Sequence, residues 1–146
     1  MSILSSALTL VTSFQDADPM GIIYHGNYFR YFEEARRLLM DQLGYSYQEM
    51  KDSGYMYPIV ETKVRYIQPI RFQQEIRVTA EVAEWQNRIR VNYVIYDAQT
   101  GQRLTKAYTI QVAVRLDNGE LCLVIPDIFM EKYNACLLQS EVDSES

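Results

Sequence analysis

The sequence predicts an α+β domain in which one long central helix is wrapped by a curved antiparallel β-sheet. Apolar residues recur every three or four positions from Asn27 to Leu43, which indicates an amphipathic helix. From Tyr57 onward, apolar and polar residues alternate for most of the chain, and this is the period of a strand. The chain has 146 residues, of which 48% are hydrophobic, so it is long enough for one domain with its own core.

The individual elements follow from local signals. The helix over 27–43 ends at Gly44, as helices commonly end at glycine, and a short second helix is expected over 47–54. A short C-terminal helix is expected from Pro126. Strands are expected over 7–14, 57–67, 76–82, 89–95, 106–116 and 121–125.

The order of these elements is strand, long helix and then several antiparallel strands. Since the long helix must bury its apolar face, a single sheet wrapped around it is the simplest arrangement. We expect one domain over 1–138 and a disordered acidic tail over 139–146.

Composition excludes several functional classes. The net charge is −5 and no block of Lys or Arg occurs, so a nucleic-acid partner is not expected. The segment 1–10 has no basic residue and no long apolar run, which argues against a signal peptide or a membrane span and favours a cytoplasmic location. Cys122 and Cys136 form no metal motif with His25, so we expect no metal, no cofactor and no disulfide, and two buried thiols.

The segment from Phe14 to Tyr28 carries the densest functional signal. It has the pattern Asp-x-Asp-x-x-Gly-x-x-Tyr-His-x-Asn-Tyr, and it runs from the first strand into the long helix. This pattern resembles the 4-hydroxybenzoyl-CoA thioesterase-like branch of the hotdog superfamily, which also includes acyl-CoA thioesterases of the Tol-Pal envelope system. The segment 64–72 in turn resembles that family's central strand and its proline-containing turn.

The resemblance implies a hotdog fold and hydrolysis of an acyl-CoA to a carboxylic acid and CoA. It implies that Asp18 is catalytic, because Asp18 matches the second aspartate of the family's pair, and that Tyr24, His25 and Asn27 stand at the helix entrance of the site. It also implies a homodimer or homotetramer with shared active sites. Arg88, in the predicted turn after Trp85, matches a region where related enzymes place basic residues against CoA phosphates; Arg71 and Arg90 are weaker candidates.

Elementary chemistry supports the same assignment. Free backbone N–H groups at a helix N-terminus can stabilise the oxyanion that forms when a thioester carbonyl is attacked. The Asp18 carboxylate could activate water as a general base or attack the carbonyl itself, and the sequence leaves both routes open. His25 is expected to orient the thioester, the water or the carboxylate, since its ordinary pKa allows proton transfer near neutrality.

Simpler structural roles compete with each of these assignments. Aspartates before Pro and Gly commonly form turns, and Asp16 is expected to organise the loop rather than to act in catalysis. Asn27 is favoured as a helix N-cap over a contact with substrate. Most of the aromatic residues over 24–32 are expected in the core, with one or two lining an acyl pocket.

Two other functions remain open at the level of sequence. One is hydration or dehydration of an enoyl thioester on the same fold, and the other is a noncatalytic acyl-thioester-binding module. The motif around Asp18 and His25 favours hydrolysis over both. The acyl group, and the choice between CoA and acyl-carrier protein, are not readable from the sequence.

Overall fold

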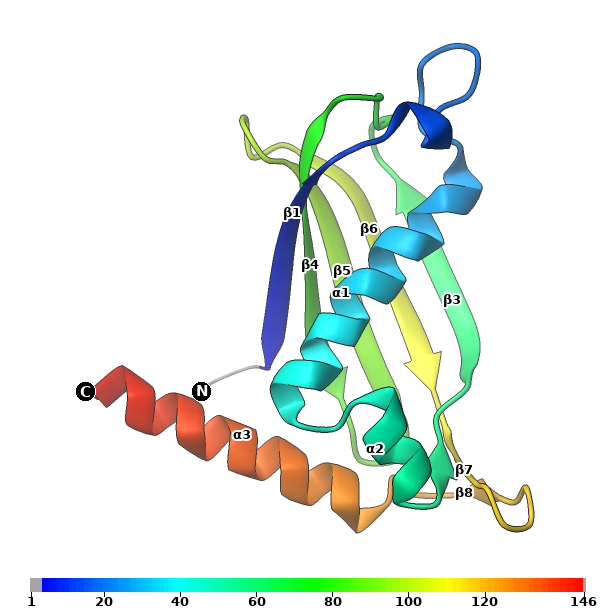
Figure 1. Ribbon diagram of the computed structural model, residues 1–146, viewed down its shortest axis with the longest axis vertical. Coiled ribbons are helices and arrows are strands. Elements are labelled where there is room, and N and C mark those ends of the chain that lie inside the picture. The colour runs from blue at the N-terminus through cyan, green and yellow to red at the C-terminus, as the bar shows by residue number, and fades with distance from the viewer. Residues whose placement is uncertain (1–3, 146) are drawn as a thin grey trace.

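The computed structural model describes the chain from residue 4 to residue 145, with side chains up to residue 139. Residues 1–3 of the predicted domain and residue 146 of the predicted tail lie outside these described residues. A five-stranded antiparallel sheet curves around the helix α1 (Tyr28–Leu43), which lies across its concave face (Figure 1). The predicted fold class is therefore confirmed.

The main sheet has the strand order β1-β4-β5-β6-β3, with bounds Ser5–Val11, Glu75–Glu84, Ile89–Asp97, Arg103–Gln111 and Ile59–Tyr66. A small second sheet has the order β2-β7-β8, with bounds Tyr55–Met56, Ala113–Arg115 and Leu121–Cys122. The remaining elements are two 3-10 turns, η1 (Phe14–Asp16) and η2 (His25–Asn27), and two helices, α2 (Tyr47–Asp52) and α3 (Asp127–Glu145).

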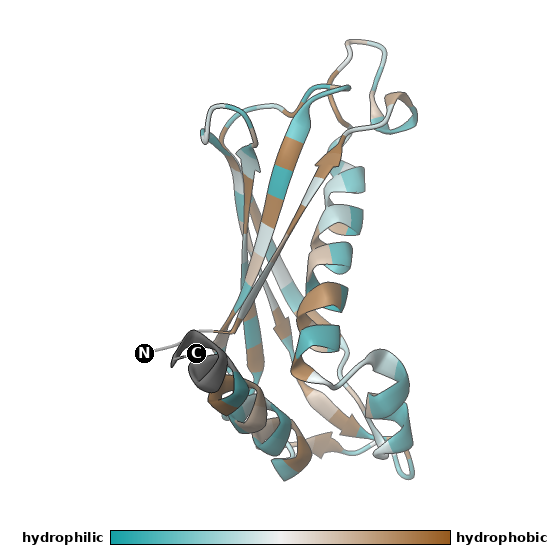
Figure 2. Cartoon of the chain, turned by 60° about the vertical axis from the view of Figure 1, so that its left-hand side comes forward, coloured by the Kyte–Doolittle hydropathy of each residue, from teal (hydrophilic) through white to brown (hydrophobic). Residues whose placement is uncertain are grey.

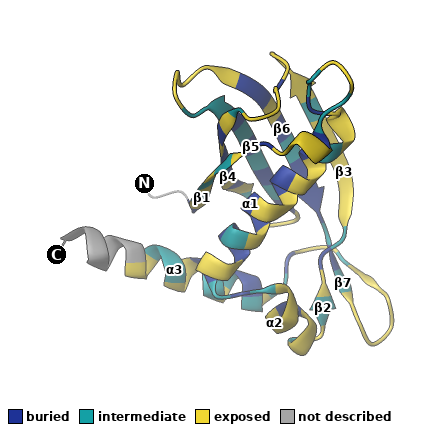
Figure 3. Cartoon of the chain, turned by 45° about the horizontal axis from the view of Figure 1, so that its top comes forward, coloured by how far each residue is buried: buried dark blue, intermediate teal, exposed yellow. Residues whose placement is uncertain are grey.

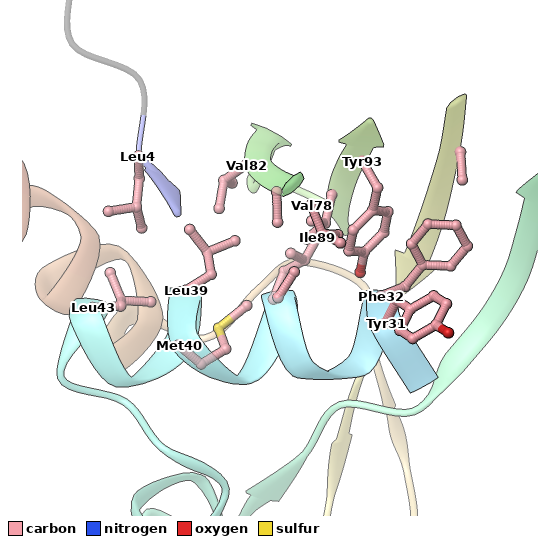
Figure 4. Packing of buried hydrophobic residues seen from close by; sticks show 14 of the residues in the cluster. Leu4, Tyr31, Phe32, Leu39, Met40, Leu43, Val78, Val82, Ile89 and Tyr93 are labelled. Atoms are coloured by element: carbon pink, nitrogen blue, oxygen red, sulfur yellow. The ribbon is translucent and has the colours of Figure 1, made fainter. Parts of the chain in front are cut away.

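The core lies between α1 and the central strands. Leu39 and Met40 of α1 face Val78, Val82 and Ile89 of the sheet, and all five side chains are buried (Figure 4). Buried and more exposed residues alternate along β4 and β5, so each of these two central strands presents one hydrophobic face to the helix (Figure 2). Full burial of one aliphatic side chain contributes about 1.5–3 kcal/mol, so this layer dominates the stability of the fold.

Several predicted boundaries differ from the structure. The long strand expected over 106–116 starts earlier, at Arg103, and is divided into β6 and β7, which belong to different sheets. The break falls at Val112, whose N–H bonds to the Pro58 carbonyl instead of continuing the main ladder. The strand expected over 121–125 is only two residues long, and the first strand ends at Val11 rather than at residue 14.

The C-terminal helix is much longer than the short helix predicted after Pro126. Helix α3 continues to Glu145, through most of the segment 139–146 that was predicted to be disordered. Phe129 and Tyr133 are buried, and Tyr133 stacks on Trp85 with ring centroids 4.4 Å apart. Packing of the first turns nucleates the helix, after which each further residue adds one hydrogen bond.

Strand β3 is an exposed edge. The segment 64–72 was predicted by resemblance to include a central strand, yet among the residues 4–145 only β6 pairs with β3. All of its residues except Val64 are exposed (Figure 3), and large apolar side chains such as Val60 and Tyr66 are among them. A long apolar edge strand is a ready template for pairing with another chain.

The two cysteines are free thiols and half-buried rather than fully buried. Cys122 ends the short strand β8 and Cys136 lies on α3, so each packs at the border of the core instead of inside it.

Burial raises the pKa of several tyrosines. The pKa of Tyr31 is raised to about 12, first by burial and then by the neighbouring Asp16 carboxylate. Burial is also the main cause of the raised pKa of Tyr28 and of Tyr93. In each case the folded protein favours the neutral phenol more strongly than the unfolded chain does.

These pKa shifts predict a loss of stability at alkaline pH. Because the folded pKa values lie above the unfolded value of about 10, their contribution is complete below pH 10 and is lost as the pH rises toward about 12. Urea denaturation should give a constant free energy of unfolding from about pH 8 to 9.5 and a falling one above about pH 10. Ionisation of all 12 tyrosines near pH 10 in a protein that stays folded would contradict this account.

Candidate active site

The loop between β1 and α1 is held by backbone hydrogen bonds within the loop and to the segment that follows β3. The Ile23 N–H donates to the Ile70 carbonyl at 2.7 Å, and the Tyr24 N–H donates to the Asp16 carbonyl at 2.9 Å. Gly21 turns the chain with a φ of +76°, a conformation that favours glycine. The loop therefore has a defined path although it lies outside the sheet.

Asp16 clamps this loop onto the helix. Its carboxylate is buried, forms an ion pair with Arg30 and accepts a hydrogen bond from the Tyr31 hydroxyl at 3.1 Å. Its backbone carbonyl accepts the N–H of Tyr24 and also the side-chain amide of Asn27. With these partners, Asp16 organises the loop, as the sequence predicts.

Asp18 has a different environment from Asp16. One of its carboxylate oxygens accepts the backbone N–H groups of Met20 at 2.9 Å and Ile22 at 3.2 Å, which makes the turn expected of an aspartate before proline. The other oxygen has no hydrogen bond within the described part of the chain. The side chain is half-buried and lines a cleft, so one oxygen is fixed while the other can face a ligand.

The entrance of α1 offers backbone donors beside this carboxylate. The turn η2 precedes the helix, and the N–H groups of Asn27 and Tyr28 are used within it. Among the residues that the structure describes, the N–H groups of His25 and Gly26 have no hydrogen-bond partner. These two donors stand at the positive end of the helix dipole, where an anion is stabilised.

The cleft that joins these features has a volume of about 340 Å³. Its lining residues come from the loop, the helix entrance and the segment after β3: Asp18, Ile22, Ile23, Tyr24, His25, Tyr28, Tyr66, Ile67, Gln68 and Pro69. Part of the wall is aromatic. The centroid of the Tyr66 ring lies 5.0 Å from that of the Tyr28 ring and 6.2 Å from that of the His25 ring. A thioester could be held here against apolar surfaces with one carboxylate nearby.

The structure brings together three of the five predicted site residues. Asp18, Tyr24 and His25 line the cleft, whereas Asn27 does not. Asn27 stands at the N-cap position but in helical conformation, and its side chain makes no capping bond. The capping role predicted for Asn27 is therefore wrong, because its amide is held by the Asp16 carbonyl instead.

Arg88 is distant from the cleft within one chain. It follows β4, is exposed, and contacts Glu84 at 3.4 Å. The register of the sheet places neighbouring Ile89 level with Ile59 of β3, seven residues from Tyr66, which is about 23 Å at 3.3 Å per residue. Only a second subunit could bring Arg88 to this cleft.

The two weaker arginine candidates have different positions. Arg71 forms a bridge with Ile22 and so lies beside the cleft. Arg90 stacks over the Tyr108 ring at 4.1 Å, in the same half of the sheet as Arg88. Within the described residues, no cluster of His, Cys, Asp and Glu could hold a metal ion, and no helix is long and apolar enough to cross a bilayer.

The family assignment follows from residues 12–133, which match the family described as the Thioesterase-like superfamily. This match includes the loop, the whole of α1 and every strand of the two sheets except β1. The chain belongs to this thioesterase family.

Similar curated proteins are named as a CoA-ester hydrolase, a putative acyl-CoA thioesterase and putative esterases. A 1,4-dihydroxy-2-naphthoyl-CoA hydrolase from Thermosynechococcus vestitus is 28% identical over 78% of each chain. A putative esterase from Aquifex aeolicus is 27% identical over 79% of this chain and 88% of its own. A putative acyl-CoA thioesterase from Bacillus subtilis is 33% identical, but that match spans only 49% of each chain.

Solved structures share the fold. A DHNA-CoA thioesterase from Staphylococcus aureus has a TM-score of 0.79 and 24% identity, covering 97% of this chain and 93% of its own. A mutant 4-hydroxybenzoyl-CoA thioesterase in complex with 4-hydroxybenzoyl-CoA has a TM-score of 0.77 and 20% identity, covering 88% and 98%. The hotdog fold expected from the sequence motif is thereby confirmed.

Sequence reasoning missed one wall of this thioesterase's cleft. Tyr66 and Ile67 lie some forty positions after His25, and nothing in their local pattern distinguishes them from other strand residues. Only the pairing of β3 with β6 brings them beside the helix entrance.

The Asp16 clamp predicts a structural rather than a chemical defect on substitution. In Asp16→Asn the free energy of unfolding should fall by about 1–3 kcal/mol, because Arg30 and Tyr31 lose a buried charged acceptor. Asp41→Asn is the matched control, since that carboxylate is exposed, and its effect should stay within about 0.5 kcal/mol. Equal stability of the two variants in urea denaturation would refute the clamp.

Proposed function

We propose that this protein hydrolyses acyl-CoA thioesters at the cleft beside the entrance of α1. The observation that carries the proposal is that a fixed carboxylate and free backbone N–H donors belong to the same cleft. Within the described part of the chain, Asp18 has one oxygen held by backbone N–H groups and one unbonded, and the N–H groups of His25 and Gly26 have no partner. Nucleophilic attack on a thioester needs both a base or nucleophile and an oxyanion site.

The reaction would proceed with the thioester carbonyl directed at the two free N–H groups. Asp18 then acts either by taking a proton from water or by attacking the carbonyl carbon to form an anhydride, which water later opens. In both routes the carbon–sulfur bond breaks, the acyl group leaves as a carboxylic acid and the sulfur leaves as CoA thiol. His25 and Tyr24, whose rings lie 4.5 Å apart, would hold the thioester in this orientation.

The exposed edge strand β3 could pair with the same strand of a second subunit. Pairing of two β3 strands across a two-fold axis would cover the exposed apolar edge and join two sheets into one, with β3 then in the centre as its resemblance implies. We therefore propose a homodimer as the minimal unit, and a homotetramer remains open. Sedimentation at micromolar concentration should show at least twice the 17.1 kDa mass of the chain. A fully active monomer would contradict it.

Other chemistries on this site are distinguished by one assay. Release of free thiol from a panel of aromatic, short, medium and long acyl-CoA esters is expected of a thioesterase. An enoyl-thioester hydratase would add or remove water without releasing thiol, and a binding module would retain the ester. Acyl-carrier-protein esters belong in the same panel, because the acidic chain would tend to repel an acidic carrier.

Asp18→Asn should lower kcat by at least about 100-fold, the lower range for loss of a general base. The asparagine oxygen can still accept the N–H groups of Met20 and Ile22, so the loop and the melting temperature should be retained. The matched comparison is Asp16→Asn, which should affect stability more than turnover. Near-normal thiol release by Asp18→Asn would move the chemistry elsewhere.

Arg88→Ala should raise KM for CoA esters and leave kcat nearly unchanged, if Arg88 reaches the CoA phosphates of a neighbouring subunit. The salt dependence of KM should also weaken, because an exposed charge contact is lost. Arg115→Ala removes a similarly exposed arginine as the control. A truncated thioester without the nucleotide should not respond to Arg88→Ala, and an equal loss with that substrate would show that the phosphate assignment is wrong.

A further inference from the structure

A second cavity lies between α1, α2 and the start of β3. Its volume is about 440 Å³. The lining residues are Arg30, Glu33, Glu34, Arg36, Arg37, Tyr47, Tyr57, Ile59 and Gln111, and we call this space the Arg36 cavity. Its lining includes Ile59 at one end of β3, whereas the lining of the cleft at Asp18 includes Tyr66 at the other end.

Arg36 is a buried cation without a counter-charge. Its side chain is only 5% exposed, and its guanidinium donates to the Tyr93 hydroxyl at 3.2 Å. Burial lowers the pKa of Arg36, but interactions with Tyr93 and Tyr47 raise it above its usual value. Its Nε has no hydrogen-bond partner, and no carboxylate of the described residues forms an ion pair with it. An arginine stays charged at all physiological pH, so a ligand or partner that supplies negative charge would stabilise this buried guanidinium.

The other charged groups around the cavity do not neutralise Arg36. Arg30 is paired with Asp16, and Arg37 is paired with Glu34 and Asp41. Glu33 stands at the exposed rim and forms no ion pair with Arg36. The inner wall is otherwise aromatic and aliphatic except for Gln111. The Nε2 of Gln111 donates to the Tyr57 carbonyl at 2.8 Å, and its buried Oε1 has no hydrogen-bond partner among the described residues.

The dimer proposed above would set this cavity beside the catalytic cleft of the other subunit. Tyr66 lines the cleft and Ile59 lines the Arg36 cavity, and the two residues lie at opposite ends of β3, about 23 Å apart. Within one chain that separation is too great for a short acyl group. Antiparallel pairing of two β3 strands brings the Tyr66 end of one next to the Ile59 end of the other.

We infer that Arg36 of the partner subunit binds the far end of the acyl group, and that the enzyme favours acyl groups that end in a carboxylate. This inference rests on the proposed thioesterase function and names its substrate class. A terminal carboxylate supplies the counter-charge that Arg36 lacks, through charge-assisted hydrogen bonds. A terminal methyl group would displace water from the cavity and leave the guanidinium unpaired. Arg36 takes part in no bond that breaks or forms.

The first test compares matched pairs of CoA esters. Dicarboxylic acyl-CoA esters from succinyl to suberyl are each assayed against the monocarboxylic ester of equal length. At the best length, the dicarboxylic ester should have a kcat/KM at least about 10-fold higher, as expected for one charge-assisted contact. Preference for the monocarboxylic ester at every length overturns the inference, whereas absence of thiol release from all esters overturns the proposed function instead.

Substitution then assigns the preference to Arg36. In Arg36→Met the ratio of the two kcat/KM values should fall to about 1 or below, and Arg36→Lys, which keeps the charge, should restore part of it. Arg77→Met removes an exposed arginine beside β1, at the far edge of the sheet, and should keep the ratio of the wild type. Circular dichroism and melting temperature identify a variant that does not fold. If Arg36→Met does not fold, the inference is tested by comparing the ratio of the two kcat/KM values between Arg36→Lys and the wild type.

A mixed dimer tests whether Arg36 acts across the interface. Asp18→Asn and Arg36→Met chains are co-expressed with two different tags and the doubly tagged dimer is isolated. If Arg36 acts on the partner's cleft, one of the two sites contains both native residues, and the dicarboxylic preference returns. If Arg36 acts within its own chain, neither site contains both and the preference stays absent. That second result overturns the assignment to the partner subunit.

Discussion

Burial of one face of α1 against the concave side of the sheet is the constraint on which the site depends. Leu39 and Met40 must face the central strands, so the rotation of the helix about its axis is fixed along its whole length. The entrance of the helix is thereby also fixed, and the N–H groups of His25 and Gly26 point from a rigid element rather than from a mobile loop. Preorganised donors of this kind stabilise developing charge without reorganising during the reaction.

Two aspartates two positions apart take opposite roles because their surroundings differ. Asp16 is turned inward to Arg30 and Tyr31, and all its contacts tie the loop to the helix. Asp18 is turned toward the cleft with one oxygen held by the backbone. A carboxylate that is already saturated by protein donors is a poor base or nucleophile, whereas one with a free oxygen beside a cleft can act on a ligand.

The sequence predicts the fold class and most of the elements because the information is local. The helix over 27–43 is set by its apolar period, and Asp18, Tyr24 and His25 could be predicted to lie together because they belong to one short motif. Tyr66 and the buried Arg36 could not be found in this way. Their positions depend on the register of β3 against β6 and on packing under α1, which no local pattern encodes.

Other differences also have tertiary causes. The division between β6 and β7 occurs where the chain leaves one sheet for another, and the length of α3 depends on Tyr133 stacking on Trp85. Asn27 is of a residue type that commonly caps helices, yet its Nδ2 donates to the Asp16 carbonyl and its side chain makes no capping bond. In each case a contact distant in sequence overrides a sound local preference.

The most direct measurement is a crystal structure of the Asp18→Asn variant with a bound acyl-CoA that it turns over slowly. The account predicts the thioester carbonyl oxygen at about 2.7–3.1 Å from the N–H of His25 or Gly26. It also predicts the substituted side chain at position 18 facing the carbonyl carbon. A thioester bound away from the helix entrance, with both N–H groups in contact with water, would contradict it.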